Sequence, residues 1–116
     1  MNVSYKNKKT EGLFSEKDLQ RLHGTKRSKL LRIRLAALEA AACLYDFWPP
    51  GSKPERCHEL TGGQRGRERQ ISIDLDHPYR LIFVPNHDPL PFKDDGGLDW
   101  KAVTQITILG VEDTHG

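Results

Sequence analysis

Apolar and polar positions divide the chain into a first part with helical spacing and a second part with strand spacing. Within residues 25–45, Leu31, Leu35 and Leu38 recur at steps of four and three, and neighbouring leucines, isoleucine and alanines widen this stripe. Such spacing is typical of a helix with one face buried. It predicts that the longest element of the protein is a helix over 25–45.

The segment before this helix predicts a shorter helix over 10–22. Ser15 and Asp18 have the spacing of a helix-capping pair near its start. His23 and Gly24 would end it, because glycine is a common stop at helix C-termini. We therefore expect two helices joined at a glycine, which would form a helical hairpin.

Strand patterns dominate the second part of the chain. Residues 70–75 alternate between apolar and polar, which is typical of a half-buried strand, and residues 79–84 are almost continuously apolar, as in an interior strand. Turn-forming residues over 76–78 predict that the two strands form a hairpin. Further strands are expected at the two ends of the chain, over 3–6 at a sheet edge and over 103–111.

The element order predicts the fold class. Loops rich in proline are expected over 48–54 and 85–99, and one helical turn over 100–102. Two helices followed by a hairpin and a last strand predict an α+β fold, with the helical hairpin on one face of a small, mainly antiparallel sheet and the other face open. The length of 116 residues favours one domain, 1–116.

Charge is segregated along the chain. Residues 1–34 contain ten Lys and Arg against three acidic residues, and residues 81–116 contain two against six. This favours a surface that faces a polyanion, although a solvated surface of mixed charge is the alternative. The chain has no signal-peptide pattern and no apolar run long enough to cross a bilayer, so a cytoplasmic protein without membrane contact is expected. Cys43 and Cys57 lack metal-ligand spacing and are expected to be reduced packing residues.

Arg80 is the clearest candidate for a functional residue, because an arginine inside an apolar strand needs an anion or a partner such as Asp74 or Asp113. Histidines and arginines without a carboxylate-rich cluster suit phosphodiester cleavage by acid–base catalysis, with no metal and no cofactor. His58 and His115 also have a plainer interpretation: His58 as a surface side chain and His115 as part of a frayed tail. The catalytic candidates are Arg80, Asp113, His58 and His115.

Seven basic residues are candidates for RNA contact, in two groups. One group lies near the start of the long helix, where cations oppose the helix dipole and are tolerated more easily if an anion binds them. The other lies in the loop over 62–69, rich in glycine and arginine, where solvated side chains are the alternative. The candidates are Lys26, Arg27, Lys29, Arg32, Arg65, Arg67 and Arg69.

Three local motifs in this order resemble the HigB-like branch of the RelE/ParE toxin superfamily, also described as plasmid-maintenance killer proteins. They read RCHELTG at 56–62, ISI at 71–73 followed by PYRLIF at 78–83, and VEDTH at 111–115. The match covers nearly the whole chain. The resemblance implies a RelE/ParE-like domain, in which a helical hairpin packs against a twisted antiparallel sheet.

For function, the resemblance implies a toxin of a type II toxin–antitoxin system that cleaves mRNA in the ribosomal A site without a metal. The implied partners are the ribosome, mRNA and a cognate antitoxin, expected to be a helix-turn-helix protein, with operator DNA contacted only through the antitoxin. Arg80 takes the place of the family's strand arginine, His115 that of its terminal histidine, and Asp113 that of the aspartate near it.

The chain departs from the family pattern at two positions. Thr61 stands where a lysine is usual, and Thr114 where a tyrosine is usual. A missing lysine removes a phosphate-binding charge, and a missing aromatic ring removes a surface for base stacking. Two alternatives therefore stay open: a non-nuclease toxin of the same fold, such as a ParE-like gyrase inhibitor, or a catalytically weakened homologue.

Overall fold

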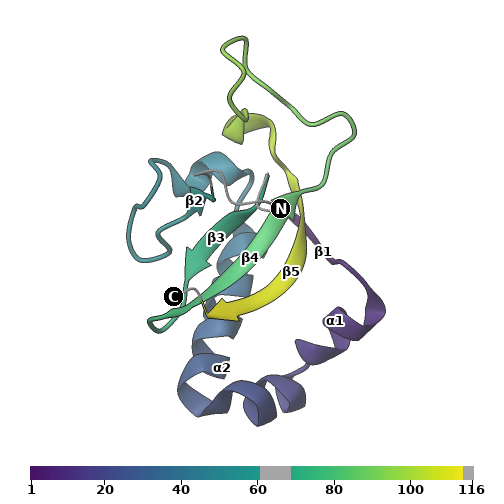
Figure 1. The fold of residues 1–116 in the computed structure, drawn as a ribbon, viewed down its shortest axis with the longest axis vertical. Coiled ribbons are helices and arrows are strands. Elements are labelled where there is room, and N and C mark those ends of the chain that lie inside the picture. The colour runs from purple at the N-terminus through teal and green to yellow at the C-terminus, as the bar shows by residue number, and fades with distance from the viewer. Residues whose placement is uncertain (61–68, 114–116) are drawn as a thin grey trace.

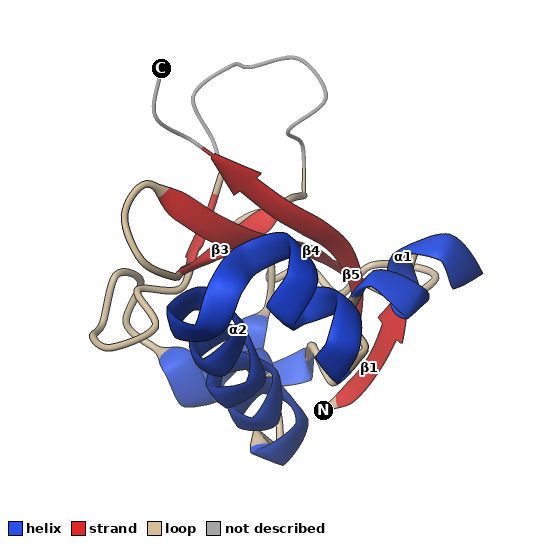
Figure 2. Ribbon diagram, turned by 90° about the horizontal axis from the view of Figure 1, so that it is seen from below, coloured by secondary structure: helices blue, strands red, loops and turns tan. Residues whose placement is uncertain are grey.

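Helices lie against one face of a five-stranded sheet in the computed structural model, which describes residues 1–60 and 69–113 (Figures 1 and 2). This arrangement confirms the expected α+β class. The helices in this part of the chain are not long and apolar enough to span a membrane. In chain order, the elements are β1 (Asn2–Tyr5), α1 (Lys8–Leu13), α2 (Glu16–Ala40), the 3₁₀ helix η1 (Leu44–Phe47), β2 (His58–Glu59), β3 (Ile71–Asp74), β4 (Tyr79–Pro85), the 3₁₀ helix η2 (Trp100–Ala102) and β5 (Gln105–Asp113).

The sheet has the strand order β1-β5-β4-β3-β2. β1 runs parallel to β5, and the other neighbouring pairs are antiparallel. The apolar strand β4 is therefore central and β1 lies at an edge, as their sequences predicted. β3 and β4 form the predicted hairpin, in which Ile71 lies opposite Phe83 and Asp74 opposite Arg80.

A sharp bend at Gly24 divides α2 into two arms. Gly24 has φ 75° and ψ 175°, a conformation that residues with a Cβ atom rarely adopt. Arg32 Nη1 lies 3.3 Å from Glu16 Oε1, whereas a straight helix would place these residues roughly 24 Å apart. The arms thus fold back on each other, which gives the predicted helical hairpin.

The predicted start of this hairpin was wrong. The segment expected as one helix over 10–22 contains a helix end at Leu13 and a new start at Glu16. The cause is Ser15, whose Oγ accepts a hydrogen bond from the backbone N–H of Asp18 at 3.2 Å and so begins a second helix.

The predicted end of the long helix was also too late. α2 ends at Ala40, and the backbone at Ala41 is extended. Asp46 then accepts a hydrogen bond from the backbone N–H of Ala42 at 2.8 Å. This side chain holds the chain in a separate turn, η1, rather than in a continued helix.

One hydrophobic core joins α2 to the sheet, and the side of the sheet that it covers is called the helix face below. Neighbouring residues of a strand point to opposite sides, so Arg80 and Ile82 of β4 lie on the other side, called the far face. Burial of a large apolar side chain contributes about 1.5–3 kcal/mol. The fully buried side chains that meet on the helix face include Leu31, Leu38, Leu81, Phe83, Ile106 and Ile108.

The far face is not open along its whole length, contrary to expectation. Ser72 and Ile82 lie on it and are fully buried. The side chains of Arg80 and Asp74, by contrast, keep 33% and 28% of their exposure. The alternation over 70–75 therefore assigned side chains to the two faces correctly, but it did not show which positions solvent reaches.

Both cysteines are free thiols. Cys57 is fully buried in the core, and this burial raises the pKa of its thiol to about 12. A thiol that stays protonated at neutral pH is a poor nucleophile. The prediction that Cys57 is a packing residue is confirmed.

Candidate functional site

A row of ion pairs crosses the accessible end of the far face. Asp74 Oδ2 lies 3.2 Å from Arg56 Nε, and Asp74 Oδ1 lies 3.5 Å from Arg80 Nε. The register fixes this arrangement, because Asp74 lies opposite Arg80. The backbone N–H of Asp74 also donates to Glu55 O at 2.7 Å, which brings the neighbouring Arg56 close. Glu112 of β5 lies opposite Arg80 on its other side. Positive and negative side chains therefore alternate across the sheet.

His58 lies on the same face, two residues along the strands from this row, opposite Ser72. Its Nδ1 is 3.0 Å from the carbonyl oxygen of Arg56. A carbonyl oxygen only accepts, so Nδ1 carries the proton in this contact and Nε2 of the neutral ring remains an acceptor. That tautomer suits a base that takes a proton from a hydroxyl group.

The strand geometry sets the distance between His58 and Arg80. They are two strands apart and offset by two residues, which corresponds to roughly 12 Å between their backbones. Both side chains are long enough to shorten this distance from either side. One nucleotide unit could contact both.

Ser72 is a buried polar group in this site. It lies between His58 and Ile82 in the register, and its Oγ has no hydrogen-bond partner among the described residues. A buried hydroxyl without a partner costs about 1–3 kcal/mol. The sequence pattern treated Ser72 as one polar position of a half-exposed strand, so it gave no signal for this burial.

Asp113 lies on the opposite side of the sheet from Arg80. It pairs with Tyr79, whereas Glu112 pairs with Arg80, and paired residues share a face. Asp113 is thus on the helix face. The two carboxylates beside Arg80 in the register are Asp74 and Glu112, and Arg80 Nε lies 3.5 Å from Asp74 Oδ1.

A β-bulge explains this placement. Thr107 lies opposite Val84, so regular alternation would bring Asp113 to the far face. The register shift between Ile82 and Phe83 adds one residue on β5 and reverses the alternation after it. Gly110 at this point has φ 151°, which favours glycine.

The basic candidates on α2 lie across the sheet from Arg80. Arg27 Nε and Nη2 donate to the carboxylate of Asp76 at 2.8 and 3.1 Å, and its guanidinium lies 3.4 Å from the centre of the Tyr79 ring. The hydrogen bond raises the pKa of Arg27 and lowers the pKa of Asp76. Arg32 contacts Glu16, as described above. The contacts of Arg27 give it a role inside the fold, whereas the side chains of Arg32 and Glu16 keep 45% and 85% of their exposure.

The remaining basic candidates do not form one surface with Arg80. Lys26 and Lys29 are exposed on α2, which packs on the helix face. Arg69 lies over the ring of Phe92, 4.5 Å from its centre. Three other predicted residues lie outside the described part of the chain, namely Arg65, Arg67 and His115, and the two departures from the family pattern, Thr61 and Thr114, do so as well.

Arg34 is a basic residue that the sequence analysis did not single out. Its exposure is only 9%, and its guanidinium donates from Nε to Asp74 O at 2.9 Å and from Nη2 to Pro54 O at 3.4 Å. It therefore holds the backbone of Asp74 and the loop before β2 in place from the helix side. Its burial could have been predicted from its spacing, because it lies three residues after Leu31 and four before Leu38, within the buried stripe of the helix.

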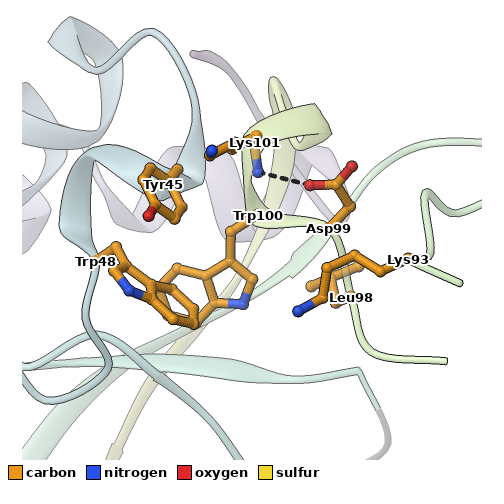
Figure 3. Close-up of a pocket in the computed structure, with 7 residues that line it drawn as sticks. All are labelled: Tyr45, Trp48, Lys93, Leu98, Asp99, Trp100 and Lys101. Carbon is orange, nitrogen blue, oxygen red and sulfur yellow. Dashed lines mark hydrogen bonds between the residues drawn. The ribbon is translucent and has the colours of Figure 1, made fainter. Parts of the chain in front are cut away.

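A pocket of about 260 Å³ lies between η1 and η2 (Figure 3). Aromatic side chains and two lysines line it. The sequence pattern predicted only a helix end, a loop and a helical turn in these segments, because the aromatic residues are far apart in the chain. They are Tyr45, Trp48 and Trp100.

Comparison with known proteins does not assign the chain to a family. No protein-family model matches the chain, and no significant match appears among curated proteins or solved structures. Within residues 1–60 and 69–113, no group of three or more His, Cys, Asp and Glu side chains is placed to hold a metal ion.

Proposed function

We propose that this protein is a ribosome-dependent mRNA endoribonuclease, the toxin of a type II toxin–antitoxin system, with a RelE/ParE-like fold. The observation that carries the proposal is the position of Arg80 on the central strand, partly exposed and on the same face as His58. Arginine binds phosphate through a planar set of donors, and an imidazole can transfer protons near neutral pH. The motif resemblance supplies the ribosome, the message and the antitoxin as partners.

In this proposal His58 Nε2 takes the proton of a ribose 2′-OH. The 2′-oxygen attacks the adjacent phosphorus, a 2′,3′-cyclic phosphate forms, and the bond to the 5′-oxygen breaks. The leaving 5′-oxygen takes a proton from a second acid, for which the sequence candidate is His115. Arg80 stabilises the negative charge that develops on the phosphoryl oxygens.

Phosphate must compete with Asp74 for Arg80. The ion pair between them is 3.5 Å long and both side chains are about one-third exposed. Such partly exposed pairs are worth about 0–1 kcal/mol. Asp74 also keeps Arg56 as a partner after the exchange, so a phosphate can take its place on Arg80 at a small cost.

The same charges favour a second candidate function. Arg80 lies between Asp74 and Glu112 in the register, and this balance of charge is also what a structural arginine would show. A non-nuclease toxin of the same fold, such as a gyrase inhibitor, or a weakened homologue would need no phosphate at Arg80.

Induced expression separates these functions. We expect primer extension to show new 5′ ends between codons of translated messages, and none on a message whose start codon has been removed. Arg21→Ala, which removes an exposed arginine of α2, is the matched control and should cleave like the parent. Double-strand DNA breaks without new mRNA ends would contradict the nuclease and support gyrase inhibition.

A further inference from the structure

The pocket between η1 and η2 has the composition of a ligand site. Figure 3 shows Tyr45 and Trp48 on one side, Lys93 and Asp99 on the other, and Trp100 between them. These residues come from three separate segments of the chain. Small-molecule sites combine apolar and aromatic walls with a few polar groups in this way.

The aromatic rings form a fixed wall with accessible surface. Tyr45 and Trp48 stack at 5.3 Å with 17° between their planes, and Trp48 meets Trp100 at 5.2 Å and 90°. Trp100 is 3% exposed, and its Nε1 donates to Glu59 Oε2 at 3.1 Å. Trp48 and Tyr45, however, keep 44% and 38% of their exposure. The buried Trp100 thus positions two rings whose surfaces can receive a ligand.

The charges in the pocket indicate an anion rather than a cation. Lys101 Nζ already lies 4.7 Å from the centre of the Tyr45 ring, in the place that a cationic ligand would take. Asp99 accepts a hydrogen bond from the backbone N–H of Lys101 at 3.1 Å. Lys93 contacts Asp95 at 3.6 Å, but both side chains are at least half exposed, so this pair exchanges easily. Two lysines beside exposed rings suit a flat, negatively charged ligand.

We propose that this pocket binds one nucleotide of single-stranded RNA. The base packs on the exposed surface of the Trp48 ring that Tyr45 leaves uncovered, and the phosphate contacts Lys93 and Lys101. The volume of about 260 Å³ limits the ligand to a single unit. Stacking of a base on an aromatic side chain is worth about 1–3 kcal/mol. The choice of RNA among flat anions rests on the proposed function.

The pocket is linked to the candidate catalytic residues. Glu59, which holds Trp100, directly follows His58 in β2. Because neighbouring residues of a strand point to opposite faces, Glu59 and the pocket lie on the other side of the edge strand β2 from His58. An RNA strand that reacts at His58 would have to pass around this edge to place a flanking nucleotide in the pocket, which would then select a base near the cleaved bond.

Tryptophan fluorescence reports on this site directly, because the two tryptophans of the chain, Trp48 and Trp100, both line it. We expect AMP and a short 2′-O-methyl RNA, which cannot be cleaved, to quench the emission in a saturable way. Inorganic polyphosphate should not. Absence of saturable quenching, or equal quenching by polyphosphate, would overturn the proposal.

Variants locate the binding. Trp48→Leu should weaken binding of a labelled 2′-O-methyl RNA, followed by anisotropy, roughly 5- to 150-fold, which corresponds to the loss of one stacked base. Lys93→Ala with Lys101→Ala should also weaken it. The matched control is Lys8→Ala with Lys9→Ala, in α1, which removes the same charge from exposed positions and should bind like the parent. Unchanged affinity in the pocket variants, with thermal unfolding like the parent, would refute the site.

Arg80→Ala separates this inference from the proposed function. We expect that variant to lose cleavage and to keep the fluorescence response. Quenching in a parent protein that does not cleave mRNA would refute the proposed function and uphold the pocket. Cleavage without quenching would uphold the function and refute the pocket.

Discussion

Arg27 and Arg80 lie near the same end of the sheet, on opposite faces. They differ in how completely other side chains of the protein occupy their guanidinium groups. Arg27 donates twice to Asp76 at 2.8 and 3.1 Å and stacks on Tyr79, and the side chains of the pair are about 20% exposed. The contact of Arg80 with Asp74 is longer, at 3.5 Å, and Asp74 also serves Arg56.

The difference separates two uses of the same side chain. A guanidinium with a bidentate partner and an aromatic ring fixes the hairpin turn against α2, and little of it remains for a ligand. A guanidinium with a shared, partly exposed carboxylate can exchange its partner for phosphate. From this contrast we infer that Arg27 serves stability and Arg80 serves function.

Replacement of Arg80 should give the largest effect. Arg80→Ala is expected to lower mRNA cleavage on programmed ribosomes by about 10²–10³, the usual loss when a charge partner of the transition state is removed. Its melting temperature should stay within a few degrees of the parent, because a partly exposed ion pair contributes about 0–1 kcal/mol. Arg27→Ala is the matched control and should show the reverse pattern, with cleavage retained and stability reduced. Parental cleavage by Arg80→Ala would remove the residue from the mechanism.

A smaller effect is expected on the helix face at acidic pH. The hydrogen bond from Arg27 lowers the pKa of Asp76 in the folded protein. A carboxylate with a lowered folded pKa adds stability above its unfolded pKa, about 3.9, and this stability is lost as pH falls through the folded pKa. The free energy of unfolding of the parent should therefore fall below about pH 4. Asp76→Asn should lack this pH-dependent part of the stability, which is about 1 kcal/mol. Asp94→Asn, an exposed loop position, is the control. Identical pH profiles for the parent and Asp76→Asn would contradict the structural role of the pair.

Hydrophobic periodicity predicted most of the fold, because long apolar stripes leave few ways to bury them. It placed the central strand, the hairpin and the glycine bend of the helices. It also indicated Arg80, since a charge in an apolar strand is conspicuous. The helix ends failed because single side chains, Ser15 and Asp46, decide them through local hydrogen bonds.

The candidate site was harder to predict because it depends on register. The extra residue of the bulge at Gly110 moves Asp113 to the helix face and Glu112 to the side of Arg80, and no periodic pattern marks it. Arg34 was missed because a charged residue in a helical stripe resembles a surface position until its carbonyl partners are known. The aromatic pocket joins residues more than fifty positions apart, such as Tyr45 and Trp100, so only the fold brings it together.

The central claim is that RNA contacts the far face of the sheet, and NMR titration tests it most directly. We expect a short 2′-O-methyl RNA to shift the amide signals of Arg56, His58 and Arg80 at concentrations that leave those of Lys26 and Lys29 unchanged. Shifts confined to Lys26, Lys29 and their neighbours on α2, with the far face unaffected, would contradict the account.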